Sequence, residues 1–230
     1  MNNPMDALDR SALAARYHQV RSSLPPHVAL VAVSKTRTVE EIQALYDLGH
    51  RAFGENYPQE LREKHPLLPR DIEWHFIGHL QRSNVKHVLP LVNLIHGIDS
   101  EKLLDEVEKR AQGLGRTVDV LLQVHIAQEE TKHGFSTEEV ETLLAHPWRW
   151  SRIRPRGLMG MATNTEDHGI VSDEFRTLAG LFERVRKTQE STFDTLSMGM
   201  SGDAPWAIAA GSNLVRIGTA LFGERAPRTA

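Results

Sequence analysis

Short apolar and β-branched runs alternate along the chain with longer amphipathic segments. Eight runs are candidate strands, and each has the length of a strand buried in a parallel sheet. They cover residues 28–35, 50–55, 73–78, 94–99, 118–126, 156–162, 195–200 and 214–218. Eight strands separated by helices predict an α/β fold, a single (β/α)8 TIM barrel, and the alternative is a doubly wound open sheet.

Helical signals fill the segments between the candidate strands. Thr38 and Ser136 each begin a capping box with a glutamate three residues later. Before the first strand, apolar residues recur at spacings of four, three and four, which predicts an extra N-terminal helix. These residues are Leu13, Tyr17, Val20 and Leu24. Because no linker or repeat divides the chain, we predict one domain over residues 1–230.

The composition narrows the possible functions. The chain has 230 residues, with 27 Lys plus Arg, 30 Asp plus Glu and a net charge of −3, so it has no overall attraction for nucleic acid or anionic membranes. It has no cysteine, which excludes disulfides and thiolate metal sites. Neither a signal peptide nor an apolar stretch of membrane-spanning length is recognisable. We therefore expect a soluble cytoplasmic protein.

Lys35 ends the first apolar run and is followed by a polar turn. Desolvation and neighbouring cations at such a position lower the pKa of a lysine, and the neutral amine can form a Schiff base with an aldehyde or ketone. The alternative is a lysine whose stem covers apolar surface while its ammonium group reaches water.

The exits of the seventh and eighth strands predict an anion site. Ser201 offers a hydroxyl, Gly202 allows close backbone approach, and a short helix over 204–210 would present free N–H groups. Gly218 and Thr219 follow the eighth strand, which neighbours both the seventh and the first in a barrel. The alternative is a pair of ordinary glycine turns.

Arg216 shares one side of its strand with Gly218, as Val33 and Lys35 share one side of theirs. A guanidinium in the mouth of a barrel needs an anionic or heterocyclic partner, and a salt bridge to Glu55 is the alternative. An amine, an anion cradle and a fixed cation around one cavity suit a phosphorylated carbonyl compound. Pyridoxal 5′-phosphate (PLP) meets all three demands.

Seven motifs, in order, carry a resemblance to a known family over about nine-tenths of the chain. They are AVSKT at 32–36, FGENY at 53–57, HFIGHLQ at 75–81, KHG at 132–134, GLM at 157–159, SMGMSGD at 197–203 and VRIGT at 215–219. Together they resemble the pyridoxal phosphate homeostasis proteins, also called YggS-like or PLP-binding proteins, whose fold is similar to the N-terminal barrel domain of alanine racemase.

The resemblance implies a role for seven residues. Lys35 would be the Schiff-base lysine, Arg216 would lie near the pyridine nitrogen, and Asn56 would line the pocket wall. The phosphate contacts would be Ser201, Gly202, Gly218 and Thr219.

An arginine beside the pyridine nitrogen disfavours amino-acid turnover. A guanidinium cannot accept the ring proton, so the ring is a poorer electron sink than one paired with a carboxylate. Racemisation also needs an acid/base group on each face of the substrate, and Lys35 serves only one. We therefore expect a non-catalytic carrier of PLP, with apo-enzymes as transient partners. The alternatives are a weak PLP-dependent amino-acid racemase and a phosphosugar aldolase or isomerase.

Three positions add detail to the resemblance. His125 and Asn213 replace residues that are more common in the family, and Lys132 is either a second lysine at the pocket entrance or a solvated loop charge. His75 and His79 are four residues apart across a strand end rather than along a helix, so we predict no metal site.

Overall fold

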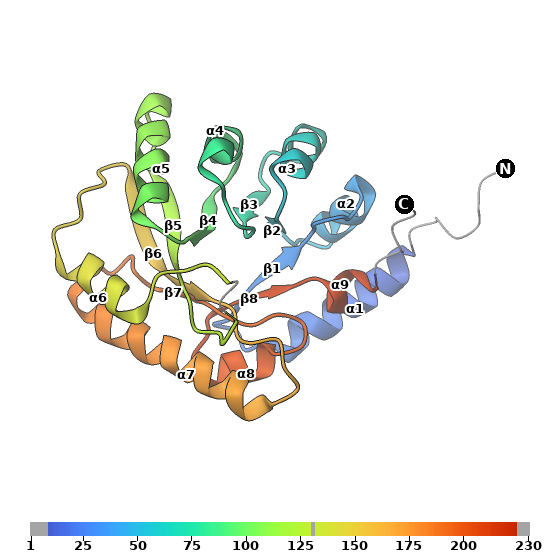
Figure 1. The fold of residues 1–230 in the computed structure, drawn as a ribbon. Helices are drawn as coiled ribbons and strands as arrows, with labels where there is room; N and C mark the ends of the chain where they lie inside the picture. The colour runs from blue at the N-terminus through green and yellow to red at the C-terminus, as the bar shows by residue number, and fades with distance from the viewer. Residues whose placement is uncertain (1–8, 130–131, 225–230) are drawn as a thin grey trace.

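The computed structural model describes residues 9–129 and 132–224, and in this part of the chain eight parallel strands close into a barrel in sequence order (Figure 1). The first and last strands pair in parallel, with Val31 opposite Arg216. The predicted barrel is confirmed, and the open sheet is wrong. The strands are β1 (Ala29–Val33), β2 (Ala52–Glu55), β3 (Glu73–Phe76), β4 (Leu94–Ile98), β5 (Val118–Val124), β6 (Ile153–Gly160), β7 (Thr195–Ser197) and β8 (Leu214–Ile217).

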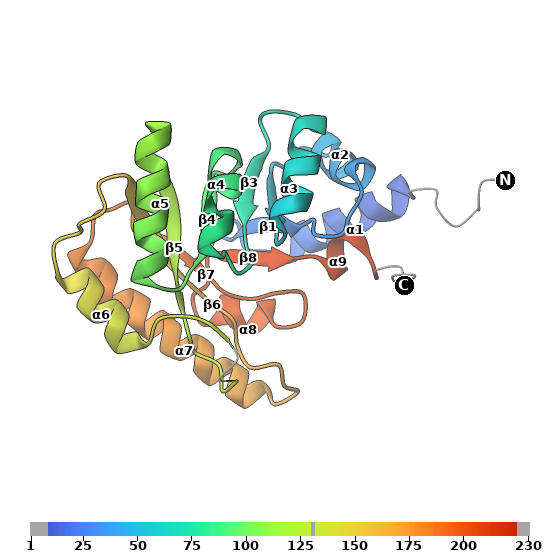
Figure 2. The same cartoon turned by 45° about the horizontal axis from the view of Figure 1, so that its top comes forward.

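Helices follow the strands and surround the barrel (Figure 2). The α-helices are α1 (Arg10–Ser23), α2 (Val39–Asp47), α3 (Pro58–Lys64), α4 (Val85–Val88), α5 (Glu101–Leu114), α6 (Thr137–Ala145), α7 (His168–Val185), α8 (Ala204–Ala209) and α9 (Thr219–Phe222). Short 3₁₀ turns are η1 (His65–Leu67), η2 (Arg82–Asn84), η3 (Leu89–Leu91) and η4 (Arg186–Thr188). No helix in the described ranges is long and apolar enough to cross a membrane.

The predicted helix starts are confirmed at both capping boxes. The Thr38 hydroxyl accepts from the Glu41 N–H and the Glu41 carboxylate accepts from the Thr38 N–H, and Ser136 and Glu139 repeat this exchange. The predicted N-terminal helix is α1. It lies beside α9, where the Arg16 side chain donates to the carbonyl of Leu221 at 2.8 Å.

Several predicted strand boundaries differ from the structure: β1 spans Ala29–Val33 rather than 28–35, and β7 ends at Ser197 rather than at residue 200. β6 begins at Ile153 rather than at residue 156, because Arg154, which resembles part of a solvated approach, belongs to the strand. Arg154 and Arg156 both form salt bridges to Asp119 on the paired strand β5, at 2.7 and 2.9 Å.

The apolar core has two parts. The larger part fills the space between the strands and the surrounding helices. A small cluster of Leu94, Leu121 and Met159, with Met161 against it, comes from the neighbouring strands β4, β5 and β6. Buried polar side chains from β3, β4, β7 and β8 form a connected group, which the next section describes.

Candidate functional site

Several of the predicted site residues lie at the carboxyl ends of neighbouring strands. Lys35 follows β1, Asn56 follows β2 and Gly218 follows β8, and β1 pairs with both β2 and β8. The added Cβ of a residue at Gly218 would lie 3.3 Å from the Cβ of Val33, so these strand ends are in close contact. This end of a parallel barrel is where active sites form.

The backbone after Lys35 is held in an unusual conformation. Thr36 has φ of 62°, a left-handed value that is uncommon for a β-branched residue. Its N–H donates to the Glu60 carboxylate at 2.6 Å. Arg37 then donates to the carbonyl of Gly223 and lies over the ring of Phe222. These contacts connect the chain beside Lys35 to α3 and to the end of α9.

A hydroxyl and two backbone N–H groups converge between β7 and β8. The Ser201 hydroxyl oxygen lies 3.3 Å from the N–H of Gly218 and 3.5 Å from the N–H of Ala220. Ser201, Gly202 and Thr219 are exposed. Together these groups form an N–H and hydroxyl cradle that is open to solvent and suited to an anion.

The turn that carries Ser201 depends on a close approach of the backbone. Gly199 has φ of 91°, and a Cβ added there would lie 2.7 Å from the Cβ of Ala207. A larger residue would push α8 away and move the turn. The N–H of Met200 donates to the Asp203 carboxylate, which closes this turn.

Arg216 is buried in β8, with 4% of its surface exposed. Its guanidinium donates to the carbonyl of Ser197 at 3.0 Å, to the Ser197 hydroxyl, and to the carbonyl of Gly160 at 3.2 Å. Within the described residues it forms no salt bridge, and burial lowers the pKa of Arg216 to about 10. The guanidinium is therefore a fixed cation with neutral partners at neutral pH.

Two buried histidines continue this network across the barrel. The Ser197 hydroxyl lies 3.2 Å from His96 Nδ1, and His96 Nε2 lies 2.9 Å from His75 Nδ1. Burial lowers the pKa of His75 to about 4 and, with the charges of His75 and Arg216, holds the pKa of His96 well below its usual value. Both imidazoles are neutral at pH 7.

A guanidinium can only donate, so Ser197 accepts from Arg216. The direction of the Ser197–His96 and His96–His75 hydrogen bonds is set by the tautomers of the two imidazoles. We call Arg216, Ser197, His96 and His75 the interior chain.

The alternative partner proposed for Arg216 is wrong. Glu55 is fully buried and accepts instead from Lys64 at 2.8 Å and from the Ser34 hydroxyl at 2.7 Å. Lys64 belongs to α3, outside the barrel wall, and also pairs with Glu60 at 2.7 Å. Burial outweighs the Lys64 charge and raises the pKa of Glu55. We call Ser34, Glu55, Glu60 and Lys64 the wall cluster.

The three positions that add detail to the resemblance all have partners. Lys132 donates to the carbonyl of Ala162, after β6, at 2.6 Å and pairs with Glu129, so it is not a purely solvated loop charge. A ring nitrogen of His125 lies 2.9 Å from the carbonyl oxygen of Glu129. The Asn213 side chain bonds the backbone of β7 at Leu196, at the opposite end of the strand from Ser201.

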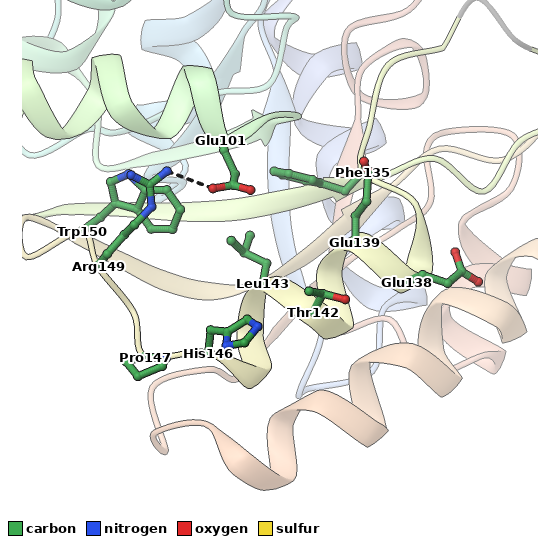
Figure 3. Close-up of a pocket in the computed structure, with 10 residues that line it drawn as sticks. All are labelled: Glu101, Phe135, Glu138, Glu139, Thr142, Leu143, His146, Pro147, Arg149 and Trp150. Carbon is green, nitrogen blue, oxygen red and sulfur yellow. Dashed lines mark hydrogen bonds and ion pairs between the residues drawn. The ribbon is translucent and has the colours of Figure 1, made fainter.

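A pocket of about 450 Å³ lies elsewhere, between α6, the start of α5 and the segment before β6 (Figure 3). None of the seven predicted site residues lines it. Glu101, Glu138 and Glu139 give it acidic groups, and Glu101 pairs with Arg149 at 2.9 Å. An acidic lining disfavours a phosphorylated ligand, so we place the candidate site at the strand ends.

Comparison with known proteins identifies the family. The alanine racemase N-terminal domain family matches residues 8–226. A pyridoxal phosphate homeostasis protein of Aquifex aeolicus is 39% identical over 197 residues, covering 85% of this chain and 86% of the relative. One from Helicobacter pylori is 42% identical over 200 residues, covering 86% and 88%. The chain belongs to the pyridoxal phosphate homeostasis protein family.

Solved structures agree with this membership of the pyridoxal phosphate homeostasis protein family. The structure of PipY from Synechococcus elongatus without PLP is 32% identical, with a TM-score of 0.87 over 92% of this chain and 100% of that one. The PipY structure with PLP bound is 31% identical, with a TM-score of 0.83 and the same coverage. Alanine racemase of Bartonella henselae, at 19% identity and a TM-score of 0.74, shares the fold over 59% of its own length.

In this member of the pyridoxal phosphate homeostasis protein family, the sequence predicted Arg216 as a site residue but did not predict the rest of the interior chain. His75 and His96 are polar residues in otherwise apolar strands, and Ser197 lies two residues before Gly199. Because alternate residues of a strand face the same side, these polar residues could have been recognised in the sequence as facing the barrel interior. Ala220 was missed because its contribution is a backbone N–H.

Proposed function

We propose that this chain binds PLP, holds it as a Schiff base on Lys35 and acts in PLP homeostasis without robust turnover. The main support for this proposal is the buried Arg216 guanidinium, whose described hydrogen-bond partners are all neutral. The Asp203 carboxylate acts on this cation through its charge and forms no hydrogen bond with it, so the guanidinium remains available to a ligand acceptor. The proposal also draws on relatives named for PLP homeostasis and on the PLP-bound PipY structure.

The residues at the strand ends fit the parts of PLP. Ser201, Gly202, Gly218 and Thr219 would hold the phosphate, because the site offers a hydroxyl and converging N–H groups there. Lys35 supplies the amine, on the strand that pairs with β8. Asn56 forms part of the wall. Its buried Oδ1 has no hydrogen-bond partner among the described residues, as expected of a group whose partner is a ligand.

PLP, when bound, supplies a reactive aldehyde and an electron-accepting ring. Arg216 would donate a hydrogen bond to the pyridine nitrogen. Because a guanidinium cannot accept a proton, the nitrogen would stay unprotonated. Because Ser197 accepts its hydrogen bond from Arg216, the interior chain cannot pass a proton to the ring through the guanidinium. Binding is therefore favoured over carbanion chemistry.

A weak amino-acid racemase is the second candidate. It would need a base opposite Lys35, and Tyr57 is the local phenol at this end of the barrel, 47% exposed beside Asn56. A phosphosugar aldolase or isomerase is less well supported, because Glu55, the carboxylate considered for acid/base work, is committed to Lys64. Apo forms of PLP-dependent enzymes are the proposed transient partners of the carrier.

The first experiment tests the attachment to Lys35. The purified full chain is mixed with PLP, its visible absorption is recorded, and borohydride reduction is followed by peptide mapping. We expect one adduct per chain, on Lys35, that is lost in Lys35→Ala and kept in Lys132→Ala. An adduct on another lysine, or none, would overturn the proposal.

A second experiment separates carrier from racemase. Amino acids are incubated in deuterium oxide with the PLP-loaded protein, and α-proton exchange is followed by NMR. A carrier gives exchange no faster than free PLP. Rapid exchange that disappears in Tyr57→Phe would instead establish the racemase.

A further inference from the structure

A second group of side chains lies at the same end of the barrel, near β3, β4 and β5. His79 follows β3, Asp99 follows β4, and His133 belongs to the segment between β5 and α6. One ligand atom from each lies within 4.8 Å of the other two. His75, four residues before His79, is not part of this group, because it pairs with His96.

The three side chains already face one another. His79 Nδ1 lies 3.1 Å from Asp99 Oδ2, and the rings of His79 and His133 are stacked with centroids 4.3 Å apart. In a tetrahedral site with metal–ligand bonds of about 2.0–2.1 Å, neighbouring ligand atoms are about 3.3 Å apart. The His79–Asp99 spacing is therefore near the required value, and His133 would complete the set by turning its ring out of the stack on His79.

Surrounding residues hold two of the three ligands in place. The Ser100 hydroxyl donates to Asp99 Oδ1 at 3.1 Å, which leaves Oδ2 directed at His79. The buried Gln123 side chain donates to the backbone carbonyl of His133 at 2.6 Å. Such outer partners are a regular feature of metal sites because they orient the ligands.

The backbone after His133 is also pinned against β5. The Phe135 N–H donates to the carbonyl of Gln123 at 2.8 Å, and its carbonyl accepts from the His125 N–H at 2.9 Å. A Cβ on Gly134 would lie 2.5 Å from the backbone nitrogen of His125, so the chain can pass this close only as glycine. The position of His133 is thus fixed by strand pairing.

We propose that His79, Asp99 and His133 bind a divalent transition-metal ion such as Zn²⁺. Two imidazoles and one carboxylate favour zinc, cobalt, nickel or iron over magnesium and calcium, which prefer oxygen ligands. Three protein ligands leave at least one coordination position for water or an anionic ligand. His79 is 46% exposed, so this position is reachable from solvent.

The test measures metal binding by the tag-free full chain after dialysis against a chelator, with no PLP added. Zn²⁺ binding is followed by calorimetry, and Co²⁺ binding by its visible absorption spectrum. We expect one ion per chain, and we expect His79→Gln, Asp99→Asn and His133→Gln each to weaken binding. The loss should exceed the about 10–100-fold that removal of an outer partner causes.

The matched control is His27→Gln, which removes an exposed histidine far along the chain from the cluster and should leave binding unchanged. Circular dichroism and thermal melting check each variant for folding. Because His133 is exposed, we expect His133→Gln to disturb folding least. Binding that survives in His133→Gln, binding that falls equally in His27→Gln, or no Co²⁺ spectrum would overturn the proposal. In those cases His79 and Asp99 only contact each other.

Discussion

Lys64 and Arg216 are both buried cations, and their surroundings differ. Lys64, in the wall cluster, contacts two carboxylates, Glu55 and Glu60. Arg216, in the interior chain, contacts two carbonyls and a hydroxyl. The first arrangement pairs the cation directly with carboxylates, whereas in the second the Asp203 carboxylate acts on the guanidinium without a hydrogen bond. We infer that the directly paired cation serves structure and that the other is available to a ligand.

Removing the cation of the wall cluster should have the largest effect on stability. Lys64→Met leaves Glu55 fully buried without its cation, which should lower the free energy of unfolding by about 3–5 kcal/mol. Urea unfolding at pH 7.5 measures this. The double variant Lys64→Met/Glu55→Gln removes both charges and should recover most of the loss. A double variant as unstable as the single one would contradict the charge argument.

Lowering the pH should change the stability contributions of the interior chain and the wall cluster in opposite directions. His75 has a folded pKa of about 4 against an unfolded value of 6.5, so the unfolded state takes up its proton first as the pH falls. Stability is fully present above pH 6.5 and falls toward pH 4, by up to about 3 kcal/mol for this histidine. The raised pKa of Glu55 acts in the opposite direction, because the folded state there binds the proton more readily.

Urea unfolding between pH 7.5 and pH 4.5 measures this loss. His50, buried with a pKa of about 4, contributes similarly and is removed in the His50→Gln background. In that background, replacing His75 and His96 with glutamine should flatten the remaining dependence. An unchanged slope would mean that the interior chain does not sense pH.

Arg216→Met should lower the free energy of unfolding less than Lys64→Met does. It should weaken PLP binding more. It leaves the carbonyls of Ser197 and Gly160 without donors, at about 1–3 kcal/mol, but leaves no opposite charge unpaired. Unfolding without PLP and a PLP titration by absorbance measure the two effects. A stability loss as large as that of Lys64→Met, with PLP binding intact, would reverse the comparison.

The smallest expected effect is at Thr36, whose N–H donates to Glu60 of the wall cluster. Its φ of 62° stores strain of about 1–3 kcal/mol, and glycine would relieve it while adding unfolded-state entropy worth roughly 0.5–1 kcal/mol. Thr36→Gly should therefore raise the free energy of unfolding by about 1 kcal/mol. Thr36→Ala is the control and should gain less. Equal gains would assign the effect to the side chain rather than to the backbone.

The sequence predicts what depends on local pattern and strand order. Lys35, Asn56 and Gly218 could be placed together because strand ends in a closed barrel lie side by side. The partners of Arg216 could not be predicted in the same way. Ser197 contacts it from the neighbouring strand β7 and in turn contacts His96 of β4, which is far away along the chain, and only the closed barrel shows which inward-facing polar residues meet. Lys64 was missed because it resembles an ordinary helix-surface lysine paired with Glu60.

The interior chain also gives the protein an internal spectroscopic reporter. Arg216 donates to Ser197, the Ser197 hydroxyl contacts His96 Nδ1, and His96 Nε2 contacts His75 Nδ1, so hydrogen bonds connect the guanidinium to both imidazoles. Any molecule that takes a hydrogen bond from the guanidinium changes how strongly Ser197 is polarised, and that change passes to His96 and then to His75. Nitrogen-15 resonances of these two rings would therefore register events at Arg216 without a label on the ligand.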